Sequence, residues 1–209
     1  NGVFWKRSTG TGGNTVQKCI MYDLSDGVRM TPDGGTEIHT NQIVKENIFY
    51  NISLNAVDCA LDGTVTGNNT NIEISNNVFD DCDVAVLLQN LVNPQVFNNI
   101  YNNIASPSYA VAHYPSTTLA TNDLDSNCYA TAFQCVFDRY DAGQSFYTDL
   151  PTMRTGESQE TNGNTSNPLF VNAALRDYRL QGTSPLIGTG QGGIDFGAYA
   201  TAGNPGATV

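Results

Sequence analysis

A short phrase recurs along this chain: an Asn precedes two apolar residues, and a small residue followed by Val comes later. Aligned on the Asn, successive repeats lie 28, 30, 22 and 28 residues apart. The first aligned column contains Cys19, Asn47, Asn77, Asn99 and Asn127, the second Ile20, Ile48, Val78, Ile100 and Cys128, and the third Met21, Phe49, Phe79, Tyr101 and Tyr129. The later pair recurs as Gly27-Val28, Ala56-Val57, Ala85-Val86, Ala110-Val111 and Cys135-Val136.

The length of this repeat limits the fold. Repeats of roughly 20 to 50 residues are typical of solenoids and propellers. Within each repeat the side chains alternate with a period of two, and the only candidate helix is the stretch YTDLPTMRTG. The pattern therefore predicts a β-solenoid. The alternative is a set of β-hairpins or a blade array, which the absence of Asn-Gly turns between the repeats disfavours.

Stacking explains why one phrase is repeated. In a parallel β-helix each coil lies about 4.8 Å from the next, so that equivalent residues stack on one another. An Asn at an inward turn can pass hydrogen bonds along the stack through its side-chain amide, and Asn tolerates the left-handed backbone that such a turn requires. We expect Asn47, Asn77 and Asn99 to stack, and the two apolar columns after them to fill the core.

Composition excludes several classes of partner. The formal net charge is -11, although only 14% of the residues are charged. Nucleic acids and anionic membranes both favour Lys and Arg, so we expect no nucleic-acid partner. No apolar run is long enough to span a bilayer, and we expect no membrane insertion. The chain starts at Asn1 without a Met or a signal peptide, which suggests that processing or truncation removed what preceded it.

The end of the chain resembles a known closing motif. The motif comprises the segments Asn167–Val171, Asp177–Leu180, Thr183–Ile187 and Asp195–Tyr199. Together they are similar to the closing coil of bacterial right-handed parallel β-helix proteins of the pectate-lyase-like superfamily. We therefore expect an all-β chain, a right-handed single-stranded parallel β-helix of about six coils with an Asn ladder. Right-handedness rests on this resemblance and on the rarity of left-handed parallel crossovers.

The repeat also suggests an organisation. Residues 1–140 are expected to form the β-helix coils, and residues 141–200 a loop excursion and the closing coil of the same domain. Residues 201–209 read as a flexible tail. Because a solenoid caps its core at both ends and no cap is evident at the start, we expect missing N-terminal coils or a stacking partner chain.

Cysteines and acidic clusters offer other possibilities. Cys19, Cys82 and Cys128 fall in interior columns, and Cys59 shares a column with Met30, Leu88 and His113; we interpret them as small buried fillers. A disulfide between Cys128 and Cys135 stays open. The chain has two His and no Cys-x-x-Cys pair, so zinc is not expected. Calcium at Asp80, Asp81 and Asp83, or at Asp123 and Asp125, stays open beside simple solvation of these carboxylates; no other cofactor is expected.

One strand face carries the candidate site. If the repeated Val points inward, its neighbours point outward. The adjacent outward positions are Arg29, Asp58, Leu87, Ala112 and Phe137; the next are Thr31, Ala60, Gln89, Tyr114 and Arg139, with His113, Asp138 and Tyr140 beside them at the strand end. Arg offers a forked donor to a carboxylate or sulfate, and Tyr offers a flat face to a sugar ring. Such a face suits an acidic or neutral glycan, although an ordinary solvated surface contains the same residue types.

The chemistry assigned to this face depends on charge. A lyase needs a cation for the uronate carboxylate and a base for the C5 proton. We assign catalysis to His113, Tyr114 and Arg139, and substrate binding to Arg29, Asp58 and Tyr140. Hydrolysis needs two carboxylates at a set separation, and Asp58 has no evident partner in the neighbouring coils.

Two functions follow from these residues and from the resemblance. The superfamily includes polysaccharide lyases, glycoside hydrolases, epimerases and noncatalytic surface proteins. We expect a secreted or cell-surface protein that interacts with a polysaccharide or cell-surface glycan; if it is an enzyme, it is a polysaccharide lyase acting on uronate-containing glycans. The alternative is a noncatalytic adhesin, a tail-fibre-like module or a filament-forming solenoid.

Overall fold

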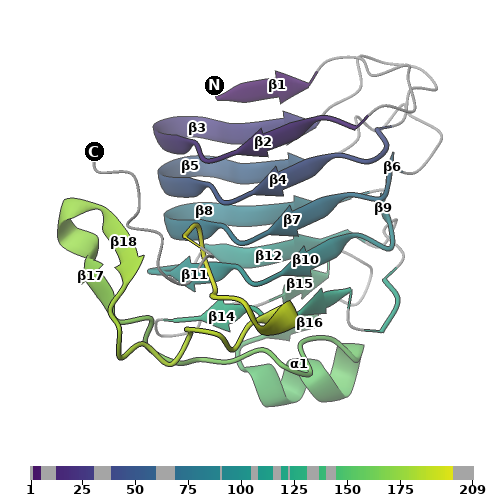
Figure 1. Ribbon diagram of the computed structural model, residues 1–209. Helices are drawn as coiled ribbons and strands as arrows, with labels where there is room; N and C mark the ends of the chain where they lie inside the picture. Colours follow the sequence, from purple (N-terminus) through teal and green to yellow (C-terminus); the bar gives the residue numbers. More distant parts are fainter. Residues whose placement is uncertain are drawn as a thin grey trace.

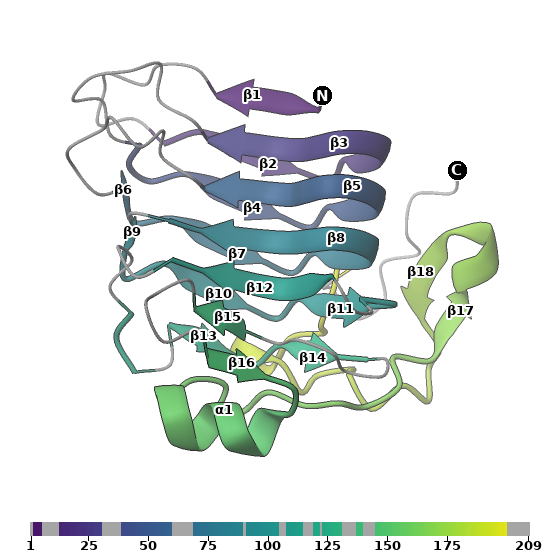
Figure 2. The same ribbon diagram turned by 180° about the vertical axis from the view of Figure 1, so that it is seen from behind.

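The computed structural model of the protein describes residues 2–5, 13–30, 39–59, 69–89, 91–104, 108–114, 119–121, 123–130, 137–139 and 145–199. These residues form a parallel β-solenoid, the fold class expected from the repeat. Strand β1 (Val3–Trp5) lies at one end of the stack and helix α1 (Leu150–Glu157) at the other (Figures 1 and 2).

Two stacked sheets make the solenoid. The five-stranded sheet contains β2 (Thr15–Gln17), β4 (Ile43–Lys45), β7 (Glu73–Ser75), β10 (Gln95–Phe97) and β13 (Leu124–Asp125). The nine-stranded sheet contains β1, β3 (Ile20–Met30), β5 (Ile48–Cys59), β8 (Val78–Leu88), β11 (Ile100–Asn102), β12 (Tyr109–His113), β14 (Cys128–Tyr129), β15 (Phe137–Arg139) and β16 (Ser145–Tyr147). Strands β6 (Asn69–Thr70) and β9 (Leu91–Val92) form a further parallel pair.

The coils become less regular along the chain. In the described residues, three coils run from a short strand into an unbroken long one: β2–β3, β4–β5 and β7–β8. In the coils that follow, the long strand is divided, first into β11 and β12 and then into β14 and β15. The sequence led us to expect about six coils, whereas three repeat both strands without a break in this part of the chain.

The corners of the coils have left-handed backbone. Positive φ angles recur every five residues, as at Asn71, Asn76 and Asp81, whose φ values are 54°, 53° and 55°. Neighbouring coils repeat the pattern at Asn41, Glu46 and Asn51 and at Asn93, Asn98 and Asn103. Asn and Asp accept this backbone region better than other residues with a Cβ. Many Asn residues of the chain therefore mark its turns. The aligned Asn column is not left-handed, contrary to expectation, because the positive φ falls on the residue before it, as at Glu46, Asn76 and Asn98.

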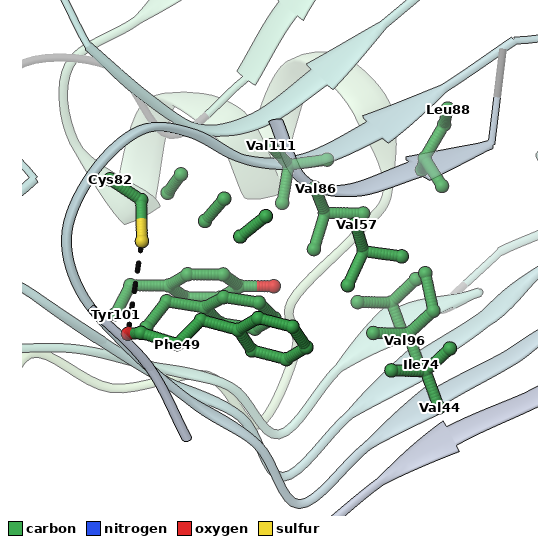
Figure 3. Packing of buried hydrophobic residues seen from close by; sticks show 14 of the residues in the cluster. Val44, Phe49, Val57, Ile74, Cys82, Val86, Leu88, Val96, Tyr101 and Val111 are labelled. Atoms are coloured by element: carbon green, nitrogen blue, oxygen red, sulfur yellow. Dashed lines mark hydrogen bonds between the residues drawn. The ribbon is translucent and has the colours of Figure 1, made fainter. Parts of the chain in front are cut away.

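Equivalent side chains stack in columns inside the solenoid. The rings of Phe49, Phe79, Tyr101 and Tyr129 lie nearly parallel, with centroids 5.1, 5.3 and 5.0 Å apart, and Figure 3 shows part of this column. The repeated Val forms a second column at the expected positions, because Val28, Val57, Val86 and Val111 are all fully buried. Spacing along the stack is set by the sheet, and offset parallel rings at this separation attract one another.

The second sequence column faces outward, contrary to the expectation that it fills the core. Ile48, Val78 and Ile100 are adjacent in sequence to the inward aromatic column, so strand alternation directs them away from it. They are buried nonetheless, because Tyr178 and Phe196 pack on them from the C-terminal part of the chain. The solenoid thus has a second apolar cluster on its outer surface.

The expected Asn stack is present. Asn47 donates its main-chain N–H and its Nδ2 to Oδ1 of Asn77, at 3.0 and 3.1 Å. Asn77 donates in the same way to Asn99, at 2.9 and 3.0 Å, and Asn99 to Asn127, at 3.0 and 3.0 Å. All four side chains are fully buried. Each coil is therefore tied to the next by a pair of bonds that the sheets do not supply.

The last segment does not continue the coils. Residues 167–200 were expected to form a closing coil, but β17 (Phe170–Asn172) and β18 (Asp177–Leu180) form an antiparallel hairpin around the 3-10 turn η1 (Ala173–Leu175). A second 3-10 turn, η2 (Gln191–Gly193), follows. The hairpin lies beside the corners where the two sheets meet (Figure 1). This segment covers the outward Ile and Val column of the solenoid.

Of the described cysteines, Cys59 and Cys82 lie in the main core cluster, whereas Cys128 lies in the outer apolar cluster against the C-terminal segment, contrary to its assignment to an interior column. Cys59, Cys82 and Cys128 are buried free thiols, and Cys19 is a half-buried one. Cys59 pairs with Leu88 in the sheet and its Sγ lies 3.9 Å from Sδ of Met30, as the column assignment predicts. Cys135, and with it the proposed disulfide to Cys128, lies outside the described residues.

Candidate functional site

The expected glycan-binding face begins on β3 and β5. Arg29 and Asp58 pair in the sheet, and Nε of Arg29 lies 3.2 Å from Oδ2 of Asp58. Asp26, which the sequence reasoning did not consider, lies 3.9 Å from the same guanidinium. Both carboxylates are buried, whereas the Arg29 side chain is 37% exposed. The Arg29 fork is thus held by two carboxylates of its own chain, which compete with any acidic ligand.

The register of β15 differs from the expected alignment by one residue. Val111 pairs with Phe137, and not with Val136, which lies outside the described residues. Consequently Asp138 stands in the row of Arg29 and Asp58, the row that was assigned to Phe137. A shift of one residue exchanges the two faces of a strand.

The pairing of β12 with β15 does not bring the three predicted catalytic residues together on one face of the sheet. His113 lies in the inward row with Leu88 and is 4% exposed, whereas the next residue, Tyr114, is half-buried. Arg139 pairs with His113 in the sheet and therefore does not stand beside Tyr114 in the outward row. Tyr140 lies outside the described residues. The described residues do not form the single outward face that the sequence suggested, and the assigned roles stay predictions.

The candidate calcium ligands serve other contacts. Asp80 is buried and accepts hydrogen bonds from Nδ2 of Asn102 and Asn103, at 2.7 Å each. Asp81 and Asp83, in contrast, are exposed. In the residues that the structure describes, no three His, Cys, Asp or Glu side chains converge in a way that suits a metal ion.

A different group of side chains forms an exposed aromatic surface. Tyr22 and Tyr50 are register partners on β3 and β5, and their rings are parallel within 4°, with centroids 5.0 Å apart. The guanidinium of Arg176, at the end of η1, lies 3.8 Å from the centroid of the Tyr50 ring. We call these three residues the Tyr22 platform. Tyr22 is 51% exposed, Tyr50 is half-buried and Arg176 is exposed.

The platform combines flat apolar faces with one positive charge. Partial burial raises the pKa of Tyr50 from its usual value, an effect that the Arg176 charge opposes, so its phenol is neutral at physiological pH. Two further apolar side chains, Ile20 at 45% exposure and Leu175 at 77%, are also exposed on β3 and η1, the elements that carry Tyr22 and precede Arg176. The surface thus offers aromatic stacking, apolar contact and a forked cation.

Part of this site was accessible from the sequence. Tyr22 and Tyr50 follow the inward third column directly, so strand alternation alone places them on the outer surface. Arg176 gives no comparable signal, because it lies outside the repeats and reaches Tyr50 only through the fold of the β17–β18 hairpin.

Comparison of the chain with protein-family models, with curated proteins and with solved structures finds no match in any of the three. Within the described ranges, no helix combines the length and the apolar character needed to cross a membrane.

Proposed function

We propose that this protein binds an acidic glycan, such as a uronate-containing polysaccharide, on the Tyr22 platform. The observation that carries the proposal is the parallel, half-exposed Tyr22–Tyr50 pair with Arg176 in contact with it. On this proposal the protein acts in secreted form or at a cell surface, where polysaccharides are found.

The chemistry of the platform suits a sugar acid. An aromatic face packs against the C–H groups of a pyranose ring, and Tyr hydroxyls at the ring edge exchange hydrogen bonds with sugar hydroxyls. A guanidinium binds a carboxylate through two parallel N–H donors. The chain carries a net charge of -11, so a cation held at this surface is what makes an acidic sugar acceptable there.

Binding is better supported than elimination. His113, one of the residues assigned to catalysis, is buried, and Arg29 is engaged by Asp26 and Asp58. We therefore propose a noncatalytic glycan-binding solenoid, a kind of protein that also occurs in the pectate-lyase-like superfamily. Membership of that superfamily is part of the proposal and rests on the closing motif from Asn167 to Tyr199.

Affinity measurements on immobilised polysaccharides test the proposal. The wild-type chain should be retained by polymers of uronic acids, and Tyr22→Ala and Arg176→Ala should each weaken binding by about tenfold, equivalent to loss of one stacking or charged contact. Lys45→Ala is the matched control, because it removes a positive charge from β4 on the other sheet. Retention should be unchanged in that variant.

Three results would overturn the proposal. Equal retention of wild type, Tyr22→Ala and Arg176→Ala would remove the platform from binding. An unsaturated product absorbing near 235 nm (a general property of β-elimination products) would show catalysis, and its loss in His113→Ala or Arg139→Ala would restore the lyase assignment. Failure to bind any glycan, together with end-to-end assembly, would instead support a structural solenoid.

A further inference from the structure

The Asn stack ends on a buried carboxylate. Asn127 donates its main-chain N–H to Oε2 of Glu160 at 3.1 Å and its Nδ2 to Oε1 at 2.6 Å. Asn47, Asn77 and Asn99 each donate the same two bonds to the Asn that follows them in the stack. Glu160 also accepts the hydroxyl of Tyr129 at 2.7 Å, and its side chain is fully buried. Glu160 thus occupies the place of the next Asn without belonging to a repeat.

A carboxylate suits this place for a chemical reason. Each Asn of the stack accepts through Oδ1 from the preceding coil and donates its main-chain N–H and one Nδ2 hydrogen to the next position, while the other Nδ2 hydrogen goes to a main-chain oxygen of the preceding coil. The last position must therefore accept two hydrogen bonds and has no further Asn below it to receive any. An ionised carboxylate is an acceptor only, whereas an Asn would bring two additional donors into the interior. The aligned amides also present the positive end of their dipoles to Glu160, by analogy with a helix N-terminus.

Burial opposes this ionised form. Desolvation raises the pKa of Glu160 to about 7, and the hydrogen bonds from Tyr129 and Asn127 only partly offset it. The titratable neighbours are Asp125, Cys128, Tyr101 and Tyr129; the Asp125 charge adds to the rise. The Arg154 side chain of α1 donates to the main-chain oxygens of Glu160 and Gly163, and not to the carboxylate.

Glu160 lies in the segment that attaches α1 to the end of the solenoid. Leu150 and Met153 of α1 are buried in the main core cluster, and the helix covers its C-terminal end (Figure 2). The main-chain N–H of Glu160 donates to O of Leu124 at 2.7 Å. Four residues later, Asn164 N donates to Asn127 O at 2.9 Å. The carboxylate therefore lies between two backbone attachments of the same segment.

We propose that Glu160 is a proton-dependent latch, which holds α1 and residues 158–164 against the end of the solenoid more tightly when its carboxyl is protonated. In the protonated form Oε1 keeps the bonds from Asn127 Nδ2 and Tyr129, and Oε2 carries the proton while its remaining lone pair still accepts the main-chain N–H of Asn127. When α1 detaches, the carboxyl returns to water and to its ordinary pKa near 4.5. The carboxyl has a pKa of about 7 when α1 is attached and near 4.5 when it is detached, so between these pH values the attached state binds more protons. Attachment is therefore strongest below pH 4.5 and weakens as the pH rises through about 7.

Native-state hydrogen exchange tests the latch. The amides of Glu160, Asn164 and Tyr129 each donate across the attachment, to Leu124, Asn127 and Asn164 respectively. After correction for intrinsic exchange, the equilibrium constant for opening at these amides should rise by roughly 70-fold between pH 5 and pH 8. This factor follows from a Glu160 pKa near 4.5 in the open state and about 7 in the closed state. Amides in β5 and β8 serve as the internal reference and should not share this change.

Two variants isolate the group. Glu160→Gln removes the titration, so the pH dependence of opening should disappear. Glu157→Gln is the matched control: this residue is the last of α1 and, like Glu160, accepts a Tyr hydroxyl, from Tyr147 at 2.8 Å, but it is only half-buried. It should behave as wild type.

A direct titration covers the case in which Glu160→Gln does not fold. In the wild-type chain, the side-chain carboxyl carbon of one Glu should titrate near pH 7, together with the exchange of residues 158–164. Opening that is independent of pH in the wild type, pH dependence that persists in Glu160→Gln, or carboxyl titrations that all lie near the ordinary value would each overturn the proposal.

Discussion

Tyr178 donates its hydroxyl to Oδ2 of Asp80 at 2.5 Å, across 98 residues of sequence. Asp80 lies on β8 and also accepts from Asn102 and Asn103, so its buried carboxylate joins two coils and the C-terminal hairpin. Burial, reinforced by the adjacent carboxylate, raises the pKa of Tyr178 far above its usual value. The phenol stays protonated and keeps donating. This contact fixes the hairpin that carries Arg176 beside the Tyr50 ring.

Tyr178→Phe should therefore lower the free energy of unfolding by about 2 kcal/mol, since it removes a hydrogen bond to a charged group while the ring still fills its place. It should also weaken glycan binding, because Arg176 is held less firmly. Urea unfolding and glycan retention measure the two effects. Tyr199→Phe in the same C-terminal segment is the control. Equal stability of the two variants would contradict the role given to this bond.

Asn77→Ala should destabilise the solenoid by about 3 kcal/mol or more. It leaves the main-chain N–H of Asn47 without its acceptor, and Nδ2 of Asn47 keeps only its bond to O of Val16. The main-chain oxygen of Val44 also loses the donor that Asn77 supplies, and each buried group left unpaired costs about 1–3 kcal/mol. Ser53→Ala is the control, because Ser53 is exposed on β5 and its backbone is not left-handed, so the change adds no strain. A denaturation midpoint for Asn77→Ala that matches the control would show that the stack contributes little.

Gly27→Ala should also destabilise the fold, by about 1–3 kcal/mol. A Cβ at Gly27 would lie 2.5 Å from O of Ala56 and 2.8 Å from the Phe49 ring, although the next repeats carry Ala at the same step. Gly182→Ala is the control, since nothing lies within 4 Å of its Cβ position. Thermal unfolding compares them, and a melting temperature for Gly27→Ala at or above that of Gly182→Ala would contradict the packing.

Thiol labelling should proceed in a set order. Cys19 is half-buried and should react first, whereas Cys59, Cys82 and Cys128 should react only after denaturation. Burial raises the pKa of Cys128 to about 12 and those of Cys59 and Cys82 further, so little reactive thiolate is present. Site-resolved mass spectrometry in a Cys135→Ser background measures the order. Rapid native labelling of Cys59 would be inconsistent with the described core.

The repeat allowed most of the solenoid to be predicted. Stacked coils place residues one repeat apart in contact, so a simple alignment yields the partners of Asn77, Phe79 and Val86. The same alignment also contains the outward direction of Ile48 and Val78, because each directly precedes an inward Phe and strand alternation turns it the other way. The expectation that both apolar columns fill the core did not take this alternation into account.

The candidate site was harder to predict because it depends on parts outside the repeat. The one-residue difference at Phe137 arises after the long strand has divided, and there the aligned pair Cys135-Val136 did not predict the register of β15. Arg176 and Glu160 reach the solenoid from the segment after the last coil. Their positions follow from how that segment packs, and a column alignment contains no information about it.

The common direction of the stacked amides has a consequence for how such a chain changes in length. Each interior coil presents the same acceptor to one neighbour and the same pair of donors to the other, so coils of 22 and 30 residues join equally well. A whole coil can thus be duplicated or deleted between Asn47 and Asn127 without leaving a mismatched bond. The coil that contains Asn127 is not interchangeable in this sense, because its partner is a carboxylate that accepts and cannot pass the bonds on.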